Sequence, residues 1–250
     1  MNRIEKDSWL LTRPIAHRGL HDRSRGIPEN SMGAFQAAMD AGYPIELDIQ
    51  MTADGELFVL HDWDLLRMTG IQRMSAALHS RELKRIALMD TEHTIPRLEE
   101  VLDLVRGRVP LLIEVKNRRS PAGRLERRLC TRMREYDGEF AVQSFNPFTV
   151  RFMRRNLPET PVGQLSDDYS GKKEIPWALR DALTNCRFNL WTRPDFISYN
   201  VRKMKDPRPF LTPLHRGGRT VVLGWTVSDE RTKARAELHC DNMIFEGIRP

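Results

Sequence analysis

The sequence predicts a (β/α)8 barrel that spans residues 1–250 as a single domain. Eight short apolar runs, rich in β-branched and aromatic residues, have the composition of buried parallel strands. Amphipathic segments with helical spacing lie between these runs. The length of 250 residues also suits this barrel. A doubly wound open sheet is the alternative, but the chain lacks the glycine-rich loops GxGxxG and GxxxxGKS/T that usually accompany it.

The eight predicted strands follow one another along the chain. They occupy residues 14–17, 45–49, 111–115, 140–143, 161–165, 195–198, 221–227 and 242–245. Helix signals separate them. Asn30 and Ser31 are cap residues before an alanine-rich segment that Gly42 ends. Further helices are predicted over 96–102, over 125–133 and after the capping residues 228–230.

One apolar run breaks the alternation of strands and helices. Residues 57–61 follow the second strand after a gap too short for a crossover helix. The gap contains Asp54 and Gly55, a strong signal for a two-residue hairpin turn. We therefore predict a small β-hairpin insertion after the second strand, with Asp48 opposite His61.

Charge and composition narrow the class of protein. The net charge of +6 and a pI of about 9.5 favour ligands that carry phosphate. Three cysteines without CxxC spacing argue against a disulfide framework and against a cysteine zinc site. No apolar run reaches the roughly 18 residues of a membrane span, and residues 1–14 carry no signal-peptide pattern. We therefore expect a cytoplasmic protein without stable membrane insertion.

Carboxylates end two of the predicted strands. Glu46 and Asp48 are two residues apart on a strand and share one face. Glu114 and Lys116 repeat this spacing on the next strand of the barrel. Polar residues at the carboxyl ends of barrel strands are typical of active sites, and three carboxylates form an oxygen site for Mg²⁺ or Ca²⁺. A buried ion-pair network with Lys116 and Arg18 is the alternative.

Two histidines complete the candidate site. His17 and Arg18 end the first predicted strand, just before Gly19. His61 ends the hairpin. Two histidines beside clustered carboxylates and an arginine are a plausible acid–base pair with a cationic phosphate clamp.

These motifs occur in a characteristic order. They are HRG at 17–19, PENS at 28–31, ELD at 46–48, HD at 61–62, PRLEEVL at 96–102, IEVK at 113–116, QSF at 143–145 and WTV at 225–227. In order and spacing they resemble the glycerophosphodiester phosphodiesterase family over nearly the whole chain. The resemblance implies a (β/α)8 barrel with a small hairpin insertion.

The resemblance also implies roles for individual residues. It implies a divalent cation, Mg²⁺ or Ca²⁺, on Glu46, Asp48 and Glu114, an acid–base pair at His17 and His61, and phosphate contacts from Arg18 and Lys116. Glu29 and Asn30 either support the site or cap a helix. The chain departs from the family at two places. Phe245 and Glu246 stand where its last strand usually ends in Thr-Asp, and the strand around Asp195–Asn200 matches only loosely.

Three functions are compatible with these residues. The resemblance implies hydrolysis of a small-molecule glycerophosphodiester to sn-glycerol 3-phosphate and an alcohol. The second is a phospholipase D-like or lysophospholipase D-like enzyme, which needs an apolar rim; the candidates are Trp9, Leu10 and Leu11, or Trp63, Leu65 and Leu66. The third is a non-catalytic barrel that binds phosphorylated ligands or nucleic acid. An acid–base pair argues against it, so we expect no nucleic-acid partner. The leaving alcohol, the ion and the oligomeric state stay open.

Overall fold

The computed structural model describes residues 4–118, 121–204 and 220–250. The chain divides into two compact units, Ile15–Phe140 and Met1–Pro14 with Ala141–Pro250. Along the chain, eight strands alternate with helices in the order of a (β/α)8 barrel, the predicted fold class, and a ninth short strand interrupts this order after β2.

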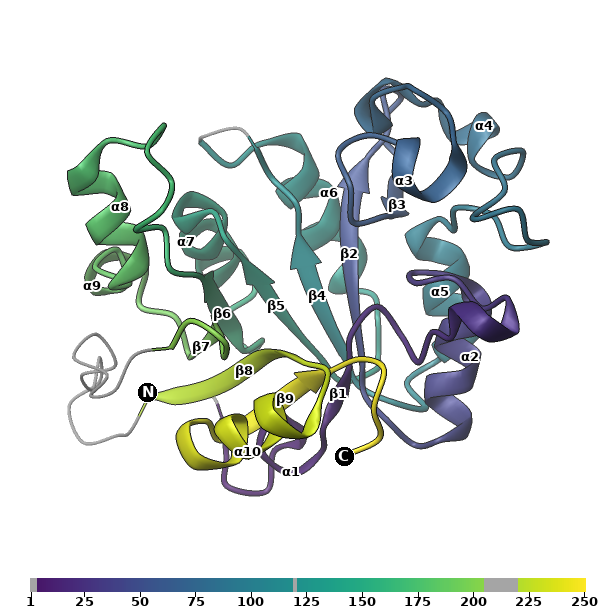
Figure 1. The fold of residues 1–250 in the computed structure, drawn as a ribbon. Helices are drawn as coiled ribbons and strands as arrows, with labels where there is room; N and C mark the ends of the chain where they lie inside the picture. The colour runs from purple at the N-terminus through teal and green to yellow at the C-terminus, as the bar shows by residue number, and fades with distance from the viewer. Residues whose placement is uncertain (1–3, 119–120, 205–219) are drawn as a thin grey trace. The chain divides into compact units, whose positions relative to one another are not determined.

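In the unit Ile15–Phe140, parallel strands flank β2 on both sides. The strands are β1 (Ile15–Ala16), β2 (Ile45–Met51) and β4 (Leu111–Val115), and the helices around them are α2 (Met32–Asp40), α5 (Leu98–Val105) and α6 (Arg124–Met133). Figure 1 shows α2 and α5 side by side along these strands. The register pairs Ile45 with Ala16 on one side and with Leu111 on the other. It also pairs Asp48 with Glu114, so acidic residues of two strands lie at one level.

The N-cap of the first predicted helix is the second of its two cap candidates. Ser31 is the N-cap, and its hydroxyl accepts the Ala34 N–H at 3.2 Å. Gly19 allows the chain after β1 to pass close to this helix. Its φ is +78°, and a Cβ there would lie 2.8 Å from the backbone carbonyl of Ala34. Close packing against the helix backbone at Ala34 therefore explains why a glycine follows His17 and Arg18.

The hairpin has a different register from the one predicted. Strand β3 (Leu57–Val59) is antiparallel to β2, and Ile49 pairs with Val59. Thr52 N–H donates to the Glu56 carbonyl at 2.9 Å, so three residues rather than two form the turn, with Gly55 at φ 95°. Asp48 therefore lies opposite Leu60, whose N–H donates to the Asp48 carbonyl at 3.0 Å. The predicted pairing with His61 is wrong by one residue.

The segment after β3 has a hydrophobic core of its own. Its helices are α3 (Leu66–Thr69), η2 (Ser75–Ala77) and α4 (Ser80–Leu83), and a further short helix, η1 (Arg23–Arg25), precedes α2. The core side chains are Phe58, Leu60, Leu65, Met68, Leu78, Leu83, Ile86, Leu88 and Ile95. Figure 1 shows α3 and α4 beyond the carboxyl end of β2. This packing fixes the loop that carries His61.

The other unit is a run of parallel strands in chain order. The strands are β5 (Phe140–Ser144), β6 (Val162–Ser166), β7 (Phe196–Asn200), β8 (Val221–Val227) and β9 (Asn242–Phe245). The helices are α1 (Trp9–Thr12), α7 (Pro147–Asn156), α8 (Trp177–Thr184), α9 (Asn189–Thr192) and α10 (Glu230–His239). Phe245 is buried, so the position that departs from the family pattern contributes an apolar side chain to the core. Among the described helices, none has the length and hydropathy needed to cross a bilayer.

Candidate active site

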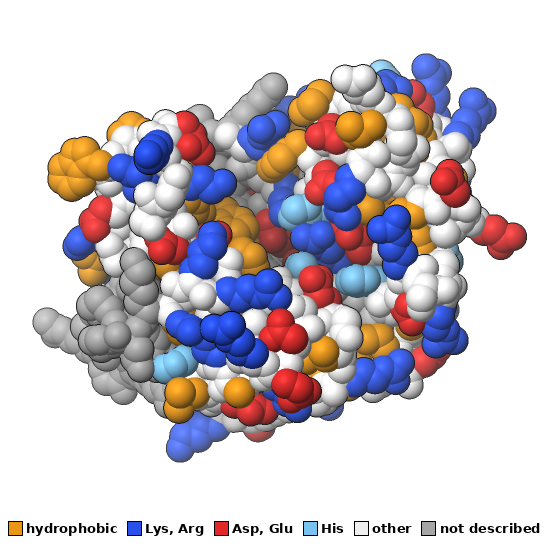
Figure 2. Space-filling model, viewed as in Figure 1, with side chains coloured by type: hydrophobic (Ala, Val, Ile, Leu, Met, Phe, Trp, Pro, Cys, Tyr) orange, Lys and Arg blue, Asp and Glu red, His pale blue; other side chains and the backbone are white. Residues whose placement is uncertain are grey.

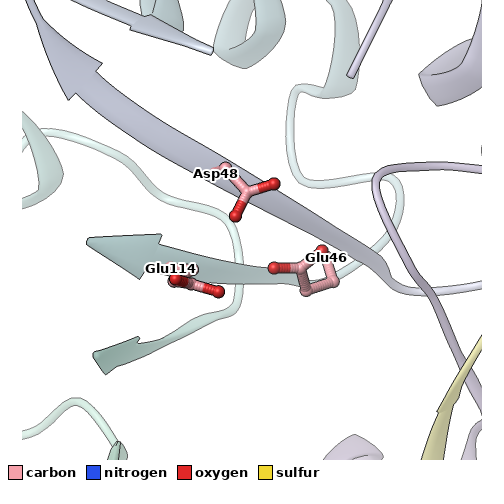
Figure 3. Close-up of side chains that lie close together, drawn as sticks. All are labelled: Glu46, Asp48 and Glu114. Carbon is pink, nitrogen blue, oxygen red and sulfur yellow. The ribbon is translucent and has the colours of Figure 1, made fainter. Parts of the chain in front are cut away.

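Three carboxylates from strands β2 and β4 converge on one another. Glu46 and Asp48 extend from β2 and Glu114 from β4, with their carboxylate groups turned toward one another (Figure 3). One oxygen of each lies within 4.8 Å of the others. All three side chains are buried. The strand register explains this cluster, because it pairs Asp48 directly with Glu114.

Two cations contact the cluster. Lys116 Nζ lies 2.7 Å from Glu114 Oε1 and 3.1 Å from Asp48 Oδ1. Arg18 Nε lies 3.3 Å from Asp48 Oδ2. The ion-pair network considered as an alternative therefore exists, but two cations do not balance three buried carboxylates.

The imbalance appears in the pKa values of the three acids. Burial, together with repulsion from Asp48 and Glu114, raises the pKa of Glu46 well above its ordinary value. Burial also raises the pKa of Glu114, to about 7, although Lys116 opposes the change. For Asp48, burial is outweighed by Lys116 and Arg18, which lower its pKa. A bound divalent cation would supply the missing positive charge, and a set of carboxylate oxygens suits Mg²⁺ or Ca²⁺. The residues present therefore fit such an ion.

The end of β1 brings His17 and Arg18 to the same cluster. Arg18 has φ 56°, and its backbone N–H donates to Glu46 Oε2 at 3.0 Å. His17 Nε2 lies 3.9 Å from that oxygen. Burial would lower the pKa of the Arg18 guanidinium, but the charges of Asp48, Glu29 and Glu46 outweigh it and raise that pKa. Arg18 is therefore a permanent cation at the cluster.

The second histidine is held by a carboxylate of its own loop. His61 Nδ1 lies 2.7 Å from Asp62 Oδ1. Burial would raise the pKa of Asp62, but hydrogen bonds from Arg67 and His61 outweigh it and lower that pKa. Because an ionised carboxylate only accepts hydrogen bonds, Nδ1 carries the proton in neutral His61 and Nε2 is the nitrogen that can exchange one. Burial is the largest of the effects that lower the pKa of His61.

The structure separates two alternatives for Glu29 and Asn30. Asn30 Nδ2 donates to Asp48 Oδ2 at 2.9 Å, while Ser31 caps α2. Glu29 Oε1 accepts from Arg18 Nη1 at 2.6 Å. Both residues therefore contact the site and neither caps the helix.

Sequence patterns miss two residues of this site. Asp62 belongs to the HD motif at 61–62, and its position beside His61 is the signal that could have assigned it a role. Arg67 is different, because nothing in the sequence connects it with Glu29, which it contacts through two nitrogens at 2.7 and 2.8 Å. Only the folded loop brings these two residues together.

Several candidates for the apolar rim of a lipid-acting enzyme are buried or covered by a polar group. Trp9, Leu10 and Leu65 are buried in the protein core. Arg118 lies over the ring of Trp63, 5.0 Å from its centroid, and Leu66 is exposed. A polar cation therefore covers the aromatic face, which weighs against the lysophospholipase D-like alternative.

The surface around the cluster has mixed charge and histidines. Figure 2 shows histidine, basic and acidic side chains gathered over β2 on the face viewed in Figure 1. Buried carboxylates, permanent cations and histidines gathered from neighbouring strands can bind a cation and a phosphate and move a proton. The fold and the site together define a (β/α)8-barrel enzyme with a buried acidic cluster.

Comparison with known proteins gives the family. The model of the glycerophosphoryl diester phosphodiesterase family matches residues 17–247, and the chain belongs to this family. It is 32% identical over 166 residues to a glycerophosphodiester phosphodiesterase of Caldanaerobacter subterraneus, covering 62% of this chain and 67% of that protein. A glycerophosphodiester phosphodiesterase of Bacillus altitudinis is 33% identical over 172 residues, covering 63% and 68%. The chain is accordingly a phosphodiesterase.

Solved structures agree on the fold. A phosphodiesterase of Oleispira antarctica, solved in complex with the product sn-glycerol-3-phosphate, has a TM-score of 0.72 at 21% identity and covers 94% of this chain and 93% of that one. A putative glycerophosphoryl diester phosphodiesterase of Silicibacter pomeroyi has a TM-score of 0.74 at 24% identity, covering 93% and 89%. The predicted (β/α)8 barrel is thereby confirmed.

Proposed function

We propose that this enzyme hydrolyses glycerophosphodiesters to sn-glycerol 3-phosphate and an alcohol, with one divalent cation, Mg²⁺ or Ca²⁺. The observation that carries the proposal is the cluster of three buried carboxylates within 4.8 Å, flanked by two histidines and two cations. The family match across residues 17–247 supports the substrate class and supports one catalytic domain over the whole chain. The product bound to the Oleispira relative agrees with this substrate.

Glu46, Asp48 and Glu114 would hold the cation. When bound, the cation supplies Lewis-acid stabilisation of the negative charge that develops on the phosphate oxygens. Asn30 supports the ligand set, because its amide donates to Asp48 and so restricts the orientation of that carboxylate.

Arg18 and Lys116 would bind the phosphate. A diester carries a negative charge that repels an attacking oxygen, and two fixed cations reduce this repulsion. Glu29 accepts from Arg18 Nη1 and orients the guanidinium. Lys116 bridges two of the acids, so its ammonium stays at the strand ends where the phosphate would lie next to the cation.

His61 and His17 would transfer the protons. Burial lowers the pKa of His61, so at neutral pH it is a neutral base with Nε2 available for proton transfer. One histidine takes a proton from water or from a glycerol hydroxyl, and the other protonates the leaving alcohol. Direct attack by water and a cyclic phosphate intermediate are both consistent with this assignment.

We expect binding of Mg²⁺ or Ca²⁺ to strengthen as the pH rises from 5.5 to 8. The raised pKa of Glu114, about 7, and that of Glu46 mean that both carboxyls hold protons in acid, and the cation must displace them. Titration calorimetry in buffers of different ionisation enthalpy measures the affinity and the protons released. Equal affinity at both pH values without proton release contradicts this assignment.

Release of sn-glycerol 3-phosphate tests the proposed function. EDTA-treated protein is incubated with glycerophosphocholine, glycerophosphoethanolamine or micellar lysophosphatidylcholine, without metal and with Mg²⁺ or Ca²⁺ restored. We expect product from the soluble diesters only after metal is restored. Turnover of the lysolipid alone, measured as release of choline with lysophosphatidic acid as the other product, favours the lysophospholipase D-like enzyme. Salt-dependent oligonucleotide binding without turnover of any diester favours the non-catalytic barrel.

A further inference from the structure

Arg67, on α3, forms ion pairs with two carboxylates of the candidate site, Asp62 and Glu29. Its Nε donates to Asp62 Oδ2 at 2.5 Å, and its Nη1 and Nη2 donate to Glu29 Oε2 and Oε1 at 2.8 and 2.7 Å. The three donors belong to one planar group, so the two carboxylates are held at a fixed distance from each other.

Each of these carboxylates contacts a residue of the proposed chemistry. Asp62 accepts from His61 Nδ1 at 2.7 Å, and Glu29 accepts from Arg18 Nη1 at 2.6 Å. A continuous series of contacts therefore runs from the histidine through Arg67 to the phosphate-binding arginine. Arg67 also keeps both carboxylates ionised. Burial would raise the pKa of Asp62 and of Glu29, but the hydrogen bonds from Arg67 lower both pKa values.

We propose that Arg67 is a positioning residue, which fixes the tautomer of His61 through Asp62 and the orientation of Arg18 through Glu29. This inference rests on the proposed function for its effect on turnover, but its effect on His61 is independent of any substrate. Arg67 itself lies two residues further from the reaction than His61 and Arg18, behind Asp62 and Glu29, so it does not act on the substrate. An ionised, oriented Asp62 keeps the proton on Nδ1, which leaves Nε2 to exchange a proton.

A lysine at this position would not replace the arginine. The contacts come from Nε on one side and from the paired Nη atoms on the other, and an ammonium group offers a single nitrogen. Arg67→Lys retains the charge but cannot reproduce the Nε contact with Asp62 together with the paired Nη contacts with Glu29. We therefore expect Arg67→Lys to show most of the loss of kcat seen in Arg67→Met. If only the positive charge of Arg67 mattered, Arg67→Lys would keep most of the wild-type kcat.

The matched control is Arg73→Met. Arg73 lies on the same inserted segment and makes a two-point ion pair with Glu82, at 2.5 and 3.2 Å, but the described contacts of this pair do not reach the site. Arg73→Met thus measures what the loss of an exposed arginine ion pair costs the segment in stability. Thermal unfolding of all variants establishes that each one folds.

The test combines kinetics with the tautomer of His61. We expect Arg67→Met to lower kcat about 10–100-fold, the usual cost of losing a partner behind a catalytic group. In ¹⁵N spectra of histidine-labelled protein, assigned with His61→Gln, we expect neutral His61 to carry its proton on Nδ1 in the wild type and to become a mixture of tautomers in Arg67→Met. Arg73→Met should match the wild type in both measurements.

A mutant cycle identifies the route of the effect. If Arg67 acts only through Asp62 and Glu29, Arg67→Met lowers kcat no further in a protein that already carries Asp62→Asn and Glu29→Gln. Additive losses, or an unchanged His61 spectrum in Arg67→Met, overturn the inference. An inactive wild type with an altered His61 spectrum in Arg67→Met instead rejects the proposed hydrolysis and upholds the positioning role.

Discussion

Replacement of His61 by alanine is expected to lower kcat about 10²–10⁴-fold, with a smaller change in KM. The imidazole is the group that Asp62 orients, and its lowered pKa leaves it neutral and able to take a proton at neutral pH. His17→Ala should cause a loss of the same order, because in the proposed mechanism one histidine accepts a proton and the other donates one. Steady-state release of sn-glycerol 3-phosphate, with metal saturating, measures both.

Leaving groups of different acidity separate the roles of the two histidines. A variant that lacks the general acid recovers on a p-nitrophenyl diester, because nitrophenolate leaves without a proton. A variant that lacks the general base stays slow on both substrates. His79→Ala is the control, because His79 is half-exposed and lies near Asp54 in the hairpin rather than at the carboxylate cluster. Near-normal kcat in both His17→Ala and His61→Ala rejects the acid–base assignment.

The carboxylate cluster could be predicted from sequence because local periodicity determines it. Residues two apart on a strand share a face, and parallel strands meet at their carboxyl ends, so Glu46, Asp48 and Glu114 had to converge once the strands were identified. The hairpin register could not be predicted as securely. One additional residue in the turn at Gly55 shifts the pairing and places Leu60 opposite Asp48.

The contacts around Arg67 depend on tertiary packing that no periodicity encodes. Its partner Glu29 is 38 residues away in sequence, and the two meet because the inserted segment folds back over the loop before α2. The same packing buries Leu65, one of the candidates for the apolar rim that a lipid-acting enzyme would need. Local sequence pattern therefore predicts which residues end a strand. The residues that orient them, such as Arg67, are determined by how the inserted segment packs.

Glu46→Gln is expected to have opposite effects on folding and on metal binding. The pKa of Glu46 is raised in the folded state, so the ionised carboxylate destabilises the fold at neutral pH. The neutral amide removes this penalty and can still accept the Arg18 N–H. We expect the metal-free variant to be more stable than the wild type by about 1 kcal/mol or more, since each pKa unit corresponds to about 1.4 kcal/mol. The gain should vanish near pH 4, where Glu46 is protonated in both states of the wild type.

With metal bound, we expect the wild type to be more stable than Glu46→Gln. A cation at 100 times its Kd stabilises the wild type by about 2.7 kcal/mol. The variant has lost one of three carboxylates and should show little of this increase, together with a loss of about 10³-fold in kcat as Lewis-acid stabilisation of several kcal/mol disappears. Thermal unfolding with and without Mg²⁺ or Ca²⁺ measures both effects, with Glu99→Gln, an acid paired with Arg132 away from the cluster, as control. If Glu46 serves only the ion-pair network, metal shifts the unfolding temperature of both variants equally. If Glu46→Gln is the more stable protein without metal and the wild type is the more stable one with metal, the acidic cluster lowers the stability of the metal-free fold and is retained because it binds the cation.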